Sequence, residues 1–161
     1  MHELDVVGVR VEMPSNQPIV LLREVDGDRF LPIWVGAGEA RAIAEAQQGV
    51  VPPRPLTHDL LRDVLLATGQ ELTEVRITEL QDGVFFAVLA FASGVEVSAR
   101  PSDSIALALR MNVRIVCVEE VLAEVGVAVT DSQEAQVEKF REFLDQVTPE
   151  DFETRGFGSR G

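Results

Sequence analysis

Three extended stretches, joined by tight turns and leading directly into a helical stretch, occur twice in this chain. The extended stretches alternate apolar and polar residues or are continuously apolar, and they cover residues 3–13, 19–25, 29–35, 71–80, 84–92 and 95–99. Hairpin dipeptides separate several of them: Asp26-Gly27, Asp82-Gly83 and Ser93-Gly94. Helical patterns follow at 36–49 and 102–111. We therefore predict an α+β fold, with a mixed, mostly antiparallel sheet built from two three-strand meanders, each followed by helices.

The other segments add further helices and one strand. Helical patterns also cover 57–69, 119–124 and 131–147, and an apolar strand covers 113–118. In the helix at 57–69, Thr57 is the expected N-cap and Gly69 the end. The predicted apolar face of this helix consists of Leu60, Leu61, Val64 and Leu65.

Three local patterns predict where individual elements lie. Pro32 lacks a backbone donor and favours an edge or bulged position for its strand. The run at 84–92 is apolar on both faces, which predicts a central strand. The helix that starts at Ser102, its expected N-cap, is apolar almost all round. Such a helix is buried against a sheet or in a subunit interface.

The two meander-plus-helix units also align with each other. Gly38 matches Ser102, Glu39 matches Asp103, and Ala40 matches Ser104, so each helix opens with one carboxylate in its first turn. The alignment predicts that the two meanders have related strand orders.

The length of 161 residues fits one domain with an appendage. We place the domain at 1–128, a C-terminal helical appendage at 129–152 and a disordered, glycine-rich tail at 153–161. The single cysteine, Cys117, lies in an apolar run, which predicts a small buried side chain and a reducing compartment. No apolar run reaches the roughly 18 residues of a membrane span. The N-terminus lacks a signal-peptide pattern, so we expect a cytoplasmic protein without a membrane partner.

The formal net charge of −13 disfavours non-specific attraction to a phosphate backbone. A local cluster of arginines, or a bound divalent metal, can reverse the field inside one cleft. The charge therefore does not exclude a protein that acts on nucleic acid.

Two Arg-Pro segments precede helices: "RPLTHDLL" at 54–61 and "ARPSDSIALALR" at 99–110. In a structural interpretation, Thr57 and Ser102 cap the helices, and the arginines pair with neighbouring carboxylates. In a functional interpretation, helix N-termini and arginines hold a phosphate. His58 then serves as general acid or base.

The functional interpretation defines a candidate site. The residues expected to carry the chemistry are His58, Asp59, Arg54, Arg100 and Asp103, and those expected to contact substrate are Thr57, Ser102, Ser104 and Glu39. The carboxylates Asp59, Asp103 and Glu39 are candidate ligands for Mg²⁺ or Mn²⁺, which prefer oxygen, and no organic cofactor is expected. Both segments lie at helix starts, so we expect the first five residues to converge in one cleft.

Five blocks in fixed order, "LPIWVGAGEARAI", "RPLTHDLL", "DGVFFAVL", "ARPSDSIALALR" and "VEEVL", make residues 3–128 resemble the bifunctional nuclease (BFN) domain family of bacteria and plants. The resemblance implies an α+β domain with nuclease activity on both RNA and DNA. The matching positions are Glu39, Ala40, Arg54, Pro55, Thr57, His58, Asp59, Leu60, Arg100, Pro101, Ser102 and Asp103. One position differs: the family usually carries an aspartate two residues before the second arginine, where this chain has Ser98.

Two function hypotheses follow. The first is a nuclease of broad specificity that cleaves phosphodiester bonds in RNA and DNA with divalent-metal assistance. The second is a non-enzymatic protein that binds a small anion or metabolite, or another protein, on the same fold. The apolar helix at 102–111 and the apolar face within 134–147 further predict a homo-oligomer, with a two-fold dimer as the first expectation.

Overall fold

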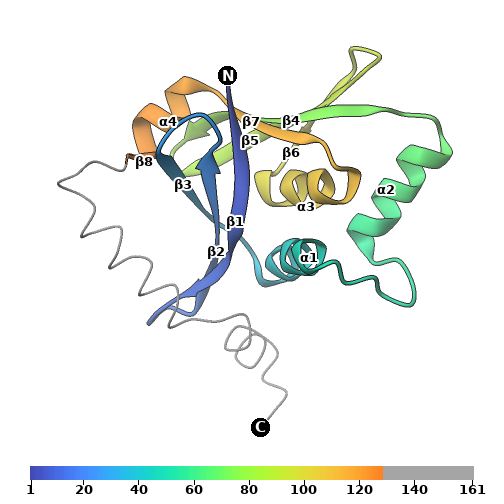
Figure 1. Cartoon of the computed structure of the whole chain (residues 1–161), viewed down its shortest axis with the longest axis horizontal. Helices are drawn as coiled ribbons and strands as arrows, with labels where there is room; N and C mark the ends of the chain where they lie inside the picture. Colours follow the sequence, from blue (N-terminus) through green and yellow to red (C-terminus); the bar gives the residue numbers. More distant parts are fainter. Residues whose placement is uncertain (129–161) are drawn as a thin grey trace, which may run out of the picture.

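The computed structural model describes residues 1–128 (Figure 1). Its elements follow in the order β1 (His2–Glu12), β2 (Gln17–Glu24), β3 (Arg29–Trp34), α1 (Ala37–Gln48), α2 (Thr57–Ala67), β4 (Leu72–Gln81), β5 (Val84–Phe91), β6 (Glu96–Ala99), α3 (Pro101–Met111), β7 (Arg114–Cys117), α4 (Glu119–Val125) and β8 (Val127–Ala128). The helix predicted at 131–147, the appendage at 129–152 and the tail at 153–161 lie outside the described residues.

The eight strands form one mixed sheet in the order β6-β5-β4-β7-β1-β2-β3-β8. Within the described part of the chain, only β4 and β7 pair in parallel, and every other neighbouring pair is antiparallel. The two predicted meanders are both present, as β1-β2-β3 and β4-β5-β6, each followed by a helix. The α+β fold class is confirmed.

The two meanders extend outward from β7 in the same strand order. β1 lies on one side of β7 and β4 on the other, and each is followed outward by the next strand of its own meander. Because β1 is antiparallel and β4 parallel to β7, the two meanders run in opposite directions. The helices that follow them, α1 and α3, pack against each other. The strand orders are therefore related, as the internal alignment predicts.

Helix α3 lies at the centre of the molecule, against the sheet, with α1 and α2 packed on it (Figure 1). Its Ile105, Ala106, Leu107 and Ala108 are buried in the main core, and Ser102 and Ser104 are buried with them. The predicted burial of this helix is confirmed. Because a single chain covers it, α3 supplies no argument for a subunit interface, and the expected homo-oligomer stays a prediction.

Cys117 ends the central strand β7 and is fully buried. Burial raises the pKa of its thiol to about 12. The side chain therefore remains a neutral thiol at ordinary pH, as predicted for a small buried hydrophobe.

Both predicted N-caps are wrong, because each helix starts earlier in the sequence than predicted. Helix α2 starts at Thr57, with Leu56 as N-cap residue, and the Leu56 N–H donates to Asp59 Oδ2 at 3.1 Å. Helix α3 starts at Pro101, with Arg100 at the N-cap. Proline fits the first helical position because its missing N–H would be unpaired there in any case.

Three other local predictions have mixed outcomes. At Pro32, β3 is paired with β2 on one side, while β8 pairs only with Arg29 and Phe30 on the other side. Pro32 therefore has an unpaired side, and its predicted edge position is confirmed. Strand β5 is internal, between β4 and β6, but Val84 and Phe86 at its start are exposed, so its apolar residues are not buried throughout. The predicted face of α2 is also wrong in part, because three of its four residues, Leu60, Leu61 and Val64, are exposed.

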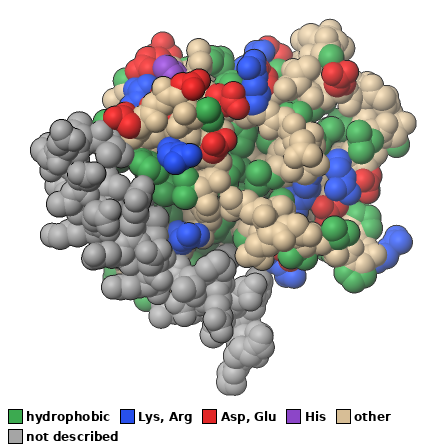
Figure 2. Space-filling model, viewed as in Figure 1, with side chains coloured by type: hydrophobic (Ala, Val, Ile, Leu, Met, Phe, Trp, Pro, Cys, Tyr) green, Lys and Arg blue, Asp and Glu red, His purple; other side chains and the backbone are tan. Residues whose placement is uncertain are grey.

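No described helix is long and apolar enough to span a membrane. On the face drawn in Figure 2, acidic and basic side chains lie next to one another rather than in separate patches. This face of the described residues therefore carries no separate basic or acidic patch.

An ion-pair network joins the β2–β3 hairpin to the start of β1 and to α4. Arg29 donates to Glu24 at 2.8 Å and to Glu119 at 2.8 Å, and His2 Nε2 lies 2.8 Å from Glu119. Hydrogen bonds from Arg29 lower the pKa of Glu119 from 4.5 to about 2 and outweigh burial to lower the pKa of Glu24. Since both pKa values are lower in the folded protein, the network stabilises the fold fully above about pH 4.5 and less as the pH falls toward about 2.

We expect a Glu24→Gln variant to melt below the native protein at neutral pH, because it leaves Arg29 with one carboxylate fewer. The difference in Tm should shrink as the pH falls, since acid protonates the native carboxylates as well. Thermal melts of both proteins across the acid range measure this. A difference in Tm that is constant with pH would contradict the role of the network.

Candidate functional site

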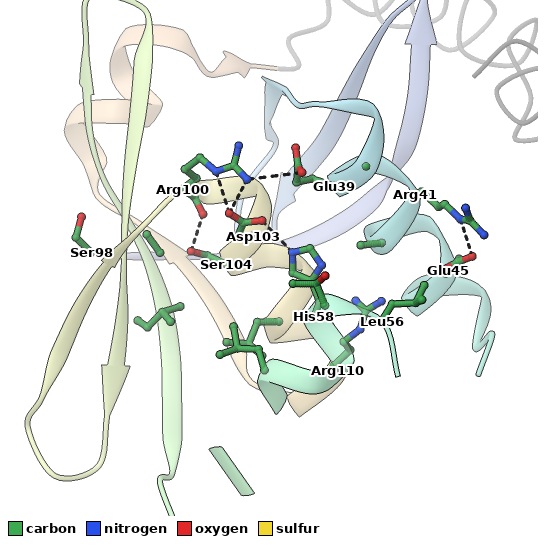
Figure 3. Close-up of a pocket in the computed structure, with 17 residues that line it drawn as sticks. Glu39, Arg41, Glu45, Leu56, His58, Ser98, Arg100, Asp103, Ser104 and Arg110 are labelled. Atoms are coloured by element: carbon green, nitrogen blue, oxygen red, sulfur yellow. Dashed lines mark hydrogen bonds and ion pairs between the residues drawn. The ribbon is translucent and has the colours of Figure 1, made fainter. Parts of the chain in front are cut away.

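A cavity of about 700 Å³ opens where three helices begin (Figure 3). The N-terminal ends of α1, α2 and α3 all contribute to its lining, and the end of β6 closes one side. The residues from these helix starts are Gly38, Glu39, Thr57, His58, Arg100, Asp103 and Ser104. We call this cavity the pocket.

His58 and Asp103 meet across the pocket, although 45 residues separate them in sequence. The Nε2 atom of His58 lies 2.9 Å from Asp103 Oδ1. Arg100 donates to the other oxygen of Asp103 at 2.9 Å and lies 3.6 Å from Glu39. Figure 3 shows these four side chains pointing toward one another. One carboxylate, that of Asp103, thus orients both the imidazole and the guanidinium.

The exposure of these side chains differs in a way that matters for chemistry. The His58 side chain is 14 % exposed and that of Asp103 is 33 % exposed, whereas 66 % of the Arg100 side chain is exposed. The hydrogen bond to Asp103, and the charges of Asp103 and Glu39, raise the pKa of Arg100. Arg100 is therefore a permanent cation at the solvent-exposed mouth of the pocket.

Three helix starts supply a second source of positive potential. The first intrahelical bonds are donated by the N–H groups of Ala40, Leu60 and Ser104, so the earlier N–H groups of each helix have no intrahelical acceptor. Such N–H groups and the helix dipole favour an anion. Within the lining, three arginines balance three carboxylates, namely Arg41, Arg100 and Arg110 against Glu39, Glu45 and Asp103. The lining side chains thus add no net positive charge, and the helix starts are the feature of the pocket that favours an anion.

Asp59 turns away from the pocket and pairs with Arg110. The Arg110 Nε donates to Asp59 Oδ1 at 2.7 Å, and the two side chains are only 6 % and 10 % exposed. Burial by itself would raise the pKa of Asp59, but the hydrogen bonds from Arg110 and from the Leu56 N–H outweigh it and lower that pKa. The pair fastens the start of α2 to the end of α3, which fixes the position of the neighbouring His58.

The structure brings together most, though not all, of the predicted site. The pocket is lined by His58, Arg100, Asp103, Glu39, Thr57 and Ser104. Asp59 instead lines a neighbouring cavity of about 320 Å³, on the other side of Arg110. Ser102 is buried in the core, and Arg54 is exposed in the connector before α2 and lines neither cavity. The predicted convergence of five residues thus applies to His58, Arg100 and Asp103.

Sequence reasoning missed Arg110, which lines both cavities. Its signal was available in the helical period, because positions 100, 103, 107 and 110 share one face of α3 and all four line the pocket. Ser98 also lines the pocket, on β6 to one side of the His58–Asp103 pair (Figure 3). The carboxylate that the family resemblance leads us to expect at this position would lie on the pocket wall.

The candidate metal ligands do not form a metal site as they are placed. Among residues 1–128, no group of three His, Cys, Asp or Glu side chains lies close enough to hold a metal ion. Asp59 is paired with Arg110 outside the pocket, and Arg100 occupies the space between Glu39 and Asp103. The residues present therefore do not fit a preformed Mg²⁺ or Mn²⁺ site.

Comparison with known proteins gives two findings. Two Mycobacterium tuberculosis proteins, from strains CDC 1551 (Oshkosh) and H37Rv (ATCC 25618), are each 56 % identical to this chain over 161 residues. The match covers 94 % of this chain and 98 % of each relative, and both relatives are named only as uncharacterized proteins. The family model of the bifunctional nuclease domain matches residues 20–130, which include all three helix starts of the pocket. This chain belongs to the bifunctional nuclease domain family.

Proposed function

We propose that this protein hydrolyses phosphodiester bonds in both RNA and DNA, and that the reaction takes place in the pocket. The observation that carries the proposal is the His58–Asp103 pair, 2.9 Å apart, at a point where three helices begin. General acid–base chemistry needs a titratable group beside the phosphate, and phosphate binding needs donors that require no rearrangement. The family match to a nuclease domain agrees with both requirements.

In the proposed reaction, Asp103 accepts the hydrogen bond from His58 Nε2–H, so that the other ring nitrogen is free to accept a proton. A water molecule attacks phosphorus while His58 takes one of its protons. The bond between phosphorus and the leaving oxygen breaks, and solvent protonates that oxygen. The N–H groups at the helix starts and the guanidinium of Arg100 stabilise the charge on the phosphoryl oxygens.

Metal assistance has no step in this reaction, because Arg100 is already ion-paired with Glu39 and Asp103, the carboxylates nearest His58. A nuclease assay with and without a chelator separates the two possibilities. Cleavage that persists in chelator supports acid–base hydrolysis without metal. Cleavage that requires Mg²⁺ or Mn²⁺ would mean that Arg100 moves aside and that Glu39 and Asp103 become ligands.

A second candidate function is binding of a small anion without catalysis. The observation that favours it is the balance of three arginines and three carboxylates in the lining, which leaves a phosphate to be held mainly by helix N–H groups. In that case, inorganic phosphate should raise the Tm of the protein while no diester is cleaved.

Arg100 offers a test that separates binding from folding. We expect Arg100→Lys to change the unfolding free energy by less than about 1 kcal/mol, because the side chain is 66 % exposed and its ion pairs are screened by water. Phosphate binding and diester cleavage should fall by about tenfold or more, since lysine lacks the planar fork. Melting curves and phosphate titrations measure the two effects. Loss of stability without loss of phosphate binding would assign Arg100 a purely structural role.

A further inference from the structure

The lining of the pocket includes an apolar part from three elements. It consists of Leu61 of α2, Leu89 of β5 and Leu107 of α3. Val97 of β6 is paired with Leu89 across the two strands, so the two side chains share one face of the sheet. Val64 follows Leu61 one turn along α2. The three lining residues, together with their neighbours Val64 and Val97 outside the lining, are called the apolar groove below.

The upper part of the apolar groove is exposed. Leu61, Val64 and Val97 are 37 %, 48 % and 45 % exposed, whereas Leu89 and Leu107 beneath them are buried. Helix α2 thus presents to solvent an apolar face of the kind that a helix ordinarily buries. Exposed apolar surface that continues from a polar pocket is typical of a ligand-contact surface.

Charge is distributed unevenly along this continuous surface. The three helix starts and the exposed cation Arg100 lie with His58 and Asp103, whereas the five groove residues are apolar. Arg110, which also lines the pocket, is held by Asp59. A ligand that places a phosphate at the polar end must therefore place an uncharged, apolar part in the groove. Unpaired nucleobases next to a phosphate have such surfaces, whereas a duplex keeps its base faces stacked inside and offers phosphates and sugars.

We propose that the apolar groove binds unpaired bases beside the phosphate being cleaved, so that single-stranded RNA or DNA is the preferred substrate. This inference rests on the proposed function, because it assumes that the phosphate is held at the His58 end of the pocket. It adds the substrate class, which neither the family match nor the pocket chemistry assigns.

The test compares three substrates: a labelled single-stranded oligonucleotide, the same strand in a duplex, and methyl p-nitrophenyl phosphate, a diester without bases. We expect kcat/KM to be at least about tenfold higher for the single strand than for the duplex. Leu61→Ser and Val97→Ser should each lower kcat/KM for the single strand by about tenfold, which corresponds to ~1.4 kcal/mol. Both variants should lower hydrolysis of the small diester by a smaller factor.

The matched control is Leu66→Ser. Leu66 lies on the same helix and is 62 % exposed, but it lies about 140° round the helix from Leu61 and does not line the pocket. The Leu66→Ser variant should cleave all three substrates as the native protein does. Val97 lies on an edge strand and is exposed, so its variant keeps the test valid if Leu61→Ser does not fold.

The results that would overturn the inference differ in what else they overturn. Equal rates on single strand and duplex would contradict only the role of the groove and leave the proposed function intact. The same holds if Leu61→Ser and Val97→Ser lower the rates on the oligonucleotide and on the small diester by equal factors. A protein that hydrolyses none of the three substrates would remove both. Light scattering that shows a dimer in the native protein and a monomer in Val97→Ser would make the groove an interface between two copies of this chain.

Discussion

Replacing Asp59 by asparagine is expected to lower the free energy of unfolding by about 3 kcal/mol, because it leaves Arg110 as a buried cation without its partner. Arg110 is only 6 % exposed, and its Nε donates to Asp59 at 2.7 Å. The lowered pKa of Asp59 also predicts a loss of stability, since the folded protein stabilises the ionised carboxylate that asparagine lacks. Denaturant unfolding at neutral pH measures the loss.

The matched control for this prediction removes both charges. An Asp59→Asn, Arg110→Met double variant should regain part of the lost stability, because no uncompensated charge is then buried. The double variant should also keep a measurable part of the native hydrolysis rate, since neither residue handles a proton in the proposed reaction. If the single Asp59→Asn variant had native stability but no activity, Asp59 would instead take part in the reaction.

Replacing His58 by alanine is expected to lower kcat for diester hydrolysis by about 10²–10⁴-fold, the usual contribution of a general acid or base. The Asp103→Asn variant should also lose activity, because an amide cannot stabilise the imidazolium and can donate its N–H to the ring, which favours the wrong tautomer. Steady-state rates on methyl p-nitrophenyl phosphate and on an oligonucleotide measure both variants. Native kcat in His58→Ala on both substrates would show that the imidazole takes no part.

The larger features of the fold could be predicted from the sequence. Alternating strands and Asp-Gly turns act over a few residues, so they define the two meanders before any tertiary contact is known. Strand β8 could not be predicted, because its two residues form a strand only where Arg29 and Phe30 offer them a partner. The exposed leucines of α2 show a second limit, since one apolar pattern describes both a face that packs in the core and a face that binds a ligand.

The site was predicted in part, for a geometric reason. His58 and Asp59 are consecutive on a helix, where neighbouring side chains point about 100° apart, and the packing of α2 on α3 directs one to the pocket and the other to Arg110. His58 meets Asp103, and Asp59 meets Arg110. The pairing partners come from the packing of α2 on α3, and the sequence near position 58 contains no signal for that packing.

The most direct test of the central claim is cleavage of labelled single-stranded RNA and DNA by the native protein, His58→Ala and His2→Ala, purified in parallel. His2 is the other of the two histidines in the chain, and it belongs to the Arg29 network, outside the pocket lining. Hydrolysis in the pocket predicts that the native protein and His2→Ala cleave both nucleic acids, while His58→Ala cleaves neither at a comparable rate. Cleavage at one and the same rate by all three proteins would contradict the account and indicate a contaminating nuclease.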